Sequence, residues 1–290
     1  MKSTRSTFAF LVLLLVCSLS FALQPSTEAL NYYGKDFQEN VSNLKDKNLK
    51  SALNTILKSG HIKSSDGSAD QIVTSCDGKS NCRMQTVLGY DGARKWMFGK
   101  YYLQTDTSGS YSVEDKYCER TYTNKDFGGH EGLAPGVIPN GNVINTEHTW
   151  PQSKFTGKYP KEMQKSDVHH LFPTDTKQNS LRGNYPFGEV VGASKTNCEP
   201  SRFGDASNSN LKVFEPPAAH KGHVARALFY FSTRYEIAIT PAEEEILKKW
   251  DAEHPVDAEE MQRNDEIYKV QGNRNPFIDF PELAKQISDF

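Results

Sequence analysis

Hydrophobic residues recur at helical spacing near both ends of the chain. Between residues 26 and 60 they fall three or four positions apart, which predicts two helices. Residues 86–99 predict a shorter helix, and residues 221–236 predict a long one with its apolar side chains on one face. A capping-box pattern with proline at the first helical position predicts a helix from Thr240, and a further helix is expected from Asp257 to Val270.

The middle of the chain has a different pattern of short apolar runs between turn residues. Residues 100–145 predict short strands, the last of which leads directly into Glu147 and His148. Residues 62–85 are polar and predict a loop, and the tail at 273–277 is expected to be extended. No linker separates a second domain, so the mixture predicts one largely helical α+β domain. Within it, a helical region (23–100) is expected to pack on a catalytic region (101–290).

The first 22 residues have the pattern of a secretory signal peptide. A short basic region is followed by an apolar run from Phe8 to Phe21, and small residues at Ser20 and Ala22 fit a cleavage site. The run is short for a membrane span, although a retained anchor is the alternative. We therefore expect a periplasmic or secreted protein, with no membrane attachment after cleavage, that acts as a monomer.

Export changes the interpretation of the cysteines. Cys17 would leave with the signal peptide, so four cysteines remain in an oxidising compartment, which suggests two disulfides. Of three connectivities we prefer Cys76–Cys82, which closes a tight loop, and Cys118–Cys198, which brackets the central stretch. A zinc site is the alternative, but the chain contains no CxxC pair.

The charge of the chain is unevenly distributed. Residues 140–234 contain 12 Lys and Arg against 8 Asp and Glu, whereas residues 235–290 contain 6 against 14. A basic middle suits a polyanionic substrate. Two ordinary solvated surfaces would give the same counts, so charge alone does not decide between these interpretations.

The central stretch, Asn145 to Asn184, contains the residue types that phosphodiester hydrolysis needs. A hard divalent metal prefers carboxylate and amide oxygens, and Glu147 and Asn179 could supply them. His148 could act as general base, because the unperturbed pKa of histidine lies near neutrality.

Glu147 and His148 are adjacent in the sequence, which restricts how they can face one site. Successive side chains on a regular strand point to opposite faces, so Glu147 and His148 share a site only if the strand ends there. Trp150-Pro151 provides that break. Thr174 or Asp175 could then cap a short helix that carries Asn179 and Arg182 on a shared face.

Each of these residues also has an ordinary structural interpretation. Glu147 could be a surface acid, Asn179 a polar residue on a helix, and His169 a buried histidine bound to a backbone carbonyl. His130 lies in a glycine-rich loop and is expected at the surface. A nucleic-acid-binding protein without turnover and a different metallohydrolase remain alternatives, although the chain has neither HExxH nor GxSxG.

From Tyr117 to Phe277 the chain resembles the bacterial endonuclease I family. The matching motifs are Tyr117-Cys118, Asn145-Thr146-Glu147-His148 with Trp150-Pro151, Ser166-Asp167-Val168-His169, Asn179 with Arg182-Gly183-Asn184, Pro216-Pro217, Ala225-Arg226-Ala227-Leu228-Phe229-Tyr230, and Val270-Gln271-Gly272-Asn273-Arg274-Asn275-Pro276-Phe277. Several motifs in the same order are specific, where a single Glu-His pair would not be. Residues 23–85 match only loosely.

The resemblance implies a ββα-metal (His-Me finger) site. In it, His148 would be the general base, and Glu147 and Asn179 would bind Mg²⁺, with Mn²⁺ or Ca²⁺ as alternatives. It also implies cleavage of DNA, and often RNA, with little sequence preference and 5′-phosphate products.

The chain departs from the family pattern at two places. The family usually has asparagine after the motif histidine, where this chain has His170. Some members have a phosphate-binding arginine between the two histidine motifs, where this chain has only lysines. We therefore expect the phosphate contact from Arg182, from Arg226 or from one of these lysines. The lysines are Lys154, Lys158, Lys161 and Lys165.

Overall fold

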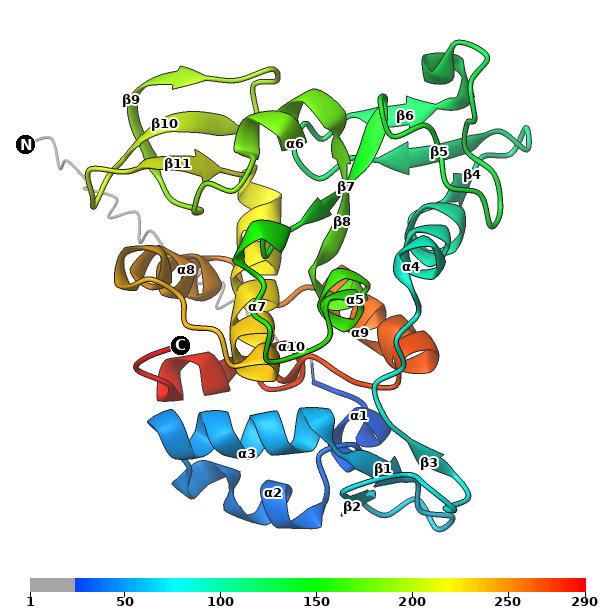
Figure 1. The fold of residues 1–290 in the computed structure, drawn as a ribbon, viewed down its shortest axis with the longest axis vertical. Helices are drawn as coiled ribbons and strands as arrows, with labels where there is room; N and C mark the ends of the chain where they lie inside the picture. The colour runs from blue at the N-terminus through cyan, green and yellow to red at the C-terminus, as the bar shows by residue number, and fades with distance from the viewer. Residues whose placement is uncertain (1–23) are drawn as a thin grey trace, which may run out of the picture.

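The computed structural model describes residues 24–290, so the predicted signal peptide lies outside the described residues. This part of the chain combines helices with small antiparallel sheets (Figure 1), which confirms the predicted α+β class. None of its helices is both long enough and apolar enough to cross a membrane.

The N-terminal region forms a layer at one end of the molecule (blue in Figure 1). Its helices are α1 (Thr27–Asn31), α2 (Lys35–Asn40) and α3 (Asp46–Lys58). The predicted polar loop contains a small sheet, in the order β2-β1-β3, of strands β1 (Gly60–Ile62), β2 (Gln71–Val73) and β3 (Cys82–Arg83). The loop prediction was wrong there because strands of two or three residues are too short to show an alternating pattern. The predicted disulfide Cys76–Cys82 is present beside this sheet.

Helix α7 (Ala218–Tyr235) runs through the centre of the molecule, and most of its residues are buried. Helix α3 packs against it, and Asn54 donates two hydrogen bonds to its last turn, to the carbonyls of Thr233 and Arg234. One apolar cluster joins α3, α7 and the C-terminal residues, through side chains such as Leu53, Phe229 and Phe277.

The C-terminal helices are α8 (Pro241–Glu253), α9 (Ala258–Gln271) and α10 (Pro276–Asp279). The first two were predicted, but the capping box at Thr240 does not form, because the Glu243 carboxylate accepts the Phe187 N–H instead. The tail prediction was wrong at Pro276, since Asn275 caps α10 by accepting the Phe277 N–H.

Two three-stranded sheets lie at the other end of the molecule (Figure 1). One has the order β4-β5-β6, and the other has the order β11-β10-β9. Their strands are β4 (Gln104–Thr105), β5 (Tyr111–Glu114), β6 (Thr121–Thr123), β9 (Val190–Lys195), β10 (Arg202–Ala206) and β11 (Lys212–Glu215). Helix α4 (Tyr90–Trp96) continues into one π-helical turn. Helix α5 (Lys161–Lys165) follows the segment 149–160.

Strands β7 (Ile144–His148) and β8 (Leu171–Asp175) form an antiparallel pair in which Glu147 lies opposite Phe172. Helix α6 (Thr176–Arg182) follows β8 directly. Two buried histidines precede β8. The Nε2–H of His170 donates to the Gln164 carbonyl (2.9 Å), and that of His169 donates to the Asn273 carbonyl (3.3 Å). Burial lowers the pKa of both imidazoles to about 4.

These two pKa values predict a loss of stability in mild acid. The unfolded chain, with ordinary histidine pKa values, binds more protons than the folded chain between about pH 6.5 and pH 4. Each histidine should therefore lower the free energy of unfolding by about 2 kcal/mol between pH 7 and pH 5. His170→Asn should reduce this pH dependence in urea denaturation, while His130→Asn, at an exposed histidine, should not. If the free energy of unfolding of His170→Asn changed with pH as steeply as that of the wild type, the lowered pKa of His170 would be contradicted.

Candidate active site

One open pocket, with a volume of about 340 Å³, contains four of the residues that the sequence singled out, namely Glu147, His148, Asn179 and Arg182. Glu147 and His148 reach it from the end of β7, and Asn179 reaches it from α6. Strand β7 ends at His148, as the geometric argument required, so the two adjacent side chains both line the pocket. Helix α6 begins where predicted, because the Asp175 side chain accepts the Gln178 N–H at 2.8 Å.

Glu147 is almost fully buried and is held through one of its two oxygens. The Tyr117 hydroxyl donates to Oε1 at 2.7 Å, and Nη1 of Arg182 lies 2.8 Å from the same oxygen. Within residues 24–290 no group donates to Oε2. Burial raises the pKa of Glu147 above its ordinary value, and the Arg182 charge and the Tyr117 hydroxyl oppose that shift. A cation beside Oε2 would favour the ionised carboxylate further.

Arg182 shapes the backbone just after His148. Its guanidinium donates to the carbonyls of His148 (3.0 Å) and Thr149 (2.7 Å), and it lies over the Phe187 ring. Only 1% of the residue is exposed. Arg182 therefore lies at the pocket, as predicted, but its guanidinium is occupied by Glu147 and the turn rather than free for a phosphate.

Asn179 lines the pocket, and of its two side-chain polar atoms only the carbonyl oxygen is left for a ligand. Its Nδ2 donates to the Thr146 carbonyl at 3.2 Å, and among the described residues nothing donates to Oδ1. An amide oxygen without a donor can serve as a ligand for a hard cation.

The hydrogen bonds of His148 define its tautomer. A carbonyl can only accept, so the contact between Nε2 and the Lys165 carbonyl (3.1 Å) places the proton on Nε2. Nδ1 then carries the lone pair, and the Gln152 amide donates to it at 3.4 Å. Burial, with the neighbouring His170 as a smaller cause, holds the pKa of His148 well below its ordinary value. The imidazole is therefore neutral at physiological pH and can accept a proton.

Arg226, the other predicted arginine, does not lie at the pocket. It is buried on α7 and pairs with Asp251 and Glu260, and it also donates to the His254 carbonyl. Helical spacing could not show this, because its acidic partners come from α8 and α9. Of the four candidate lysines, Lys165 contacts the predicted base through its backbone carbonyl. Its ammonium is 4.1 Å from the centroid of the Tyr90 ring, and that ring is 5.4 Å from the His148 ring.

Asp115, a fully buried acid that no sequence pattern indicates, joins two parts of the site. Its carboxylate accepts the backbone N–H groups of Tyr117 (2.9 Å) and Asp175 (3.0 Å), as well as those of Cys118 and Arg120. It therefore connects the tyrosine that holds Glu147 with the N-cap of α6. A single acid near a turn has no sequence signature that separates it from a surface residue. The predicted disulfide Cys118–Cys198 fastens the same turn.

The pocket thus combines one carboxylate oxygen and one amide oxygen without donors and a neutral imidazole whose Nδ1 lone pair accepts only a long contact from Gln152. The two oxygens fit a hard divalent cation such as Mg²⁺, and the imidazole fits a general base. These are the residue types that a metal-assisted hydrolase needs.

Comparison with known proteins agrees with this class. The model of the endonuclease I family matches residues 45–282. The chain is 37% identical to an extracellular ribonuclease of Bacillus subtilis (strain 168) over 173 residues, which are 52% of this chain and 56% of that protein. It is 31% identical to an extracellular deoxyribonuclease of Aeromonas hydrophila over 150 residues, which are 49% of this chain and 63% of that protein. The chain thus spans a little over half the length of these relatives. It belongs to the endonuclease I family.

The hydroxyl of Tyr117 should raise the affinity for Mg²⁺, because its hydrogen bond helps to orient the Glu147 carboxylate. Tyr117→Phe should weaken Mg²⁺ binding about tenfold, since removing a group that orients a metal ligand typically costs this much. Isothermal titration calorimetry would measure the change. Tyr33→Phe is the matched control, because Tyr33 makes a similar buried bond to Asp279 outside the pocket. Equal Mg²⁺ affinity in Tyr117→Phe and Tyr33→Phe would show that the Tyr117 hydroxyl is not needed to orient the Glu147 carboxylate.

Proposed function

We propose that this protein is a secreted or periplasmic, Mg²⁺-dependent endonuclease that hydrolyses phosphodiester bonds of DNA and RNA. The observation that carries the proposal is that His148, Glu147 and Asn179 line one pocket. The relatives named extracellular ribonuclease and extracellular deoxyribonuclease support an exported enzyme that accepts both sugars.

His148 would begin the reaction by taking a proton from a water molecule on Nδ1. The Nε2–H bond to the Lys165 carbonyl holds the ring in the orientation and tautomer that this step needs. The water oxygen then bonds to phosphorus while the bond from phosphorus to the 3′ oxygen breaks. The products are a 5′-phosphate and a 3′-hydroxyl, which takes a proton from solvent.

Glu147 and Asn179 would hold the divalent cation, which when bound neutralises charge on the phosphate and on the leaving oxygen. Arg182 would act on the ligand rather than on the substrate. Its ion pair with Glu147 (2.8 Å) and its bonds to the turn keep that carboxylate in place.

Lys165 would supply the positive charge for the scissile phosphate. Its ammonium lies over Tyr90, which itself lines the pocket. Lys158 is already paired with Glu236 at 2.8 Å, and neither Arg182 nor Arg226 has a free guanidinium. Lys154, after β7, and Lys161, at the start of α5, are both exposed, where they could contact more distant phosphates.

Replacement of the predicted base tests the central assignment. His148→Ala should cleave supercoiled plasmid DNA about a thousandfold more slowly than the wild type in Mg²⁺, because general-base catalysis typically contributes 10² to 10⁴ in rate. His130→Ala, which removes an exposed histidine, should retain full activity.

EDTA separates this enzyme from a nucleic-acid-binding protein without turnover. EDTA should stop cleavage of plasmid DNA and of RNA by the wild type, and added Mg²⁺ should restore both. Plasmid cleavage by a folded His148→Ala protein at the wild-type rate would contradict the mechanism, and absence of cleavage by the wild type would favour simple binding.

Two nearby lysines, Lys158 before α5 and Lys165 at its end, distinguish a phosphate contact from general surface charge. Lys165→Ala keeps the backbone carbonyl that binds His148 but should lower kcat/KM at least about tenfold, the cost of one charge-assisted hydrogen bond. Lys158→Ala removes the same charge at a lysine already paired with Glu236, so kcat/KM should change less than about twofold. Equal losses in the two variants would rule out a specific role for Lys165.

A further inference from the structure

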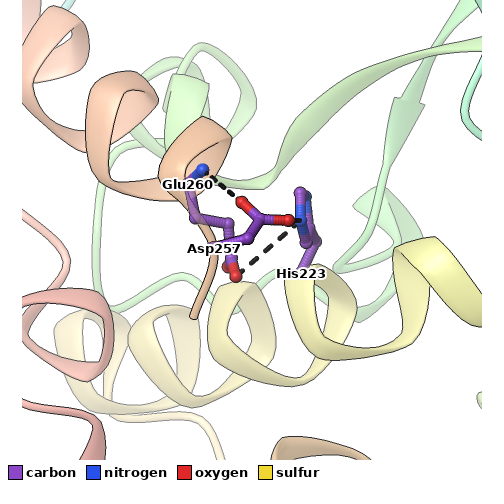
Figure 2. A group of neighbouring side chains, drawn as sticks. All are labelled: His223, Asp257 and Glu260. Carbon is purple, nitrogen blue, oxygen red and sulfur yellow. Dashed lines mark hydrogen bonds and ion pairs between the residues drawn. The ribbon is translucent and has the colours of Figure 1, made fainter. Parts of the chain in front are cut away.

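A histidine and two carboxylates converge where the middle of α7 meets the start of α9 (Figure 2). Nε2 of His223 lies 3.2 Å from Oδ2 of Asp257 and 3.7 Å from Oε2 of Glu260. One ligand atom from each residue lies within 4.8 Å of the others. None of the three residues lines the pocket that contains Glu147, so this cluster is a separate feature.

Other groups of the protein hold both carboxylates in place by hydrogen bonds. Oδ1 of Asp257 accepts the Glu260 N–H at 2.8 Å, which leaves Oδ2 turned toward His223. Arg226 donates to both oxygens of Glu260, from Nε to Oε1 (2.9 Å) and to Oε2 (3.1 Å) and from Nη2 to Oε2, and Asp251 holds Arg226 at 2.9 Å. Metal-binding carboxylates in proteins typically have such supporting hydrogen bonds.

Nε2 of His223 is bonded to Asp257, but the other three imidazole nitrogens of His220 and His223 have no hydrogen bond within residues 24–290. His223 is 6% exposed, and its Nδ1 has no hydrogen bond within residues 24–290. His220, on the preceding turn of α7, is 3% exposed, and neither of its ring nitrogens has a partner there. The two rings are 5.6 Å apart. A buried polar group without a partner costs roughly 1–3 kcal/mol, so this junction favours an occupant that imidazole nitrogen can bind.

The charge balance also favours a cation. Asp251, Asp257 and Glu260 provide three carboxylates against two cations, the guanidinium of Arg226 and the ammonium of Lys285, which acts on Asp251. The side chain of Asp257 is 53% exposed, which gives an ion access from solvent.

We propose that His223, Asp257 and Glu260 form a second metal site, which takes a borderline transition-metal cation such as Zn²⁺. Bonds of 2.0–2.1 Å in a tetrahedral site separate the ligand atoms by about 3.3 Å, which is close to the distances from Nε2 to the two carboxylates. Imidazole nitrogen prefers Zn²⁺ over Mg²⁺, whereas the oxygen ligands of the other pocket favour Mg²⁺. The bound ion would join α7 to α9.

Zinc titration of the purified protein tests this site. After EDTA treatment and dialysis, with excess Mg²⁺ present to occupy the pocket of Glu147 and Asn179, calorimetry should detect one Zn²⁺ per chain with a micromolar or lower Kd. Glu147→Ala should bind this ion with the same Kd. His223→Ala should weaken it at least about tenfold, and His130→Ala, at an exposed histidine, should not change it.

Asp257→Asn covers the case in which His223→Ala does not fold. Asparagine caps a helix as well as aspartate does, so α9 should keep its start while the site loses one anionic ligand. This variant should also bind Zn²⁺ at least about tenfold more weakly, with an unchanged circular dichroism spectrum. Wild-type Zn²⁺ affinity in Asp257→Asn, or no Zn²⁺ binding by the wild type, would overturn the proposal.

Discussion

The buried ion pair between Glu147 and Arg182 is the contact on which the site depends. Two charges removed from water are stable only with good geometry and further hydrogen bonds. Here Tyr117 supplies a hydrogen bond to the carboxylate, and two backbone carbonyls accept from Nη1 and Nη2 of the guanidinium. The same contacts set the direction of the free carboxylate oxygen and the turn that brings His148 into the pocket. One interaction therefore positions both the proposed metal ligand and the proposed base.

The partners of this ion pair come from distant parts of the chain. Tyr117 lies on a turn that the Cys118–Cys198 disulfide fastens, and Arg182 is at the end of α6. Asp115 joins the two by accepting backbone N–H groups from both the tyrosine turn and the α6 N-cap. An exported protein can rely on such a disulfide, because its compartment is oxidising. Long-range packing, rather than any local motif, therefore gives the pocket its shape.

Local patterns predicted the elements that carry the site but not their partners. The end of β7 followed from the period of a strand, and the start of α6 followed from a capping residue, so Glu147, His148 and Asn179 could be placed together from the sequence. Local patterns did not show which basic residues are free to contact a phosphate. Arg182 and Arg226 look like free cations in a basic stretch, yet each is buried against carboxylates that other segments supply. No periodicity encodes such contacts.

The central claim is that Glu147 Oε2 and Asn179 Oδ1 present one site to a single divalent cation beside His148. Crystals grown with Mn²⁺ in place of Mg²⁺ would test it most directly through the anomalous difference map. The account predicts a peak within about 2.0–2.6 Å of both oxygens, the range of bonds from hard cations to oxygen. Full occupancy of Mn²⁺ elsewhere, with no peak between Glu147 and Asn179, would contradict it.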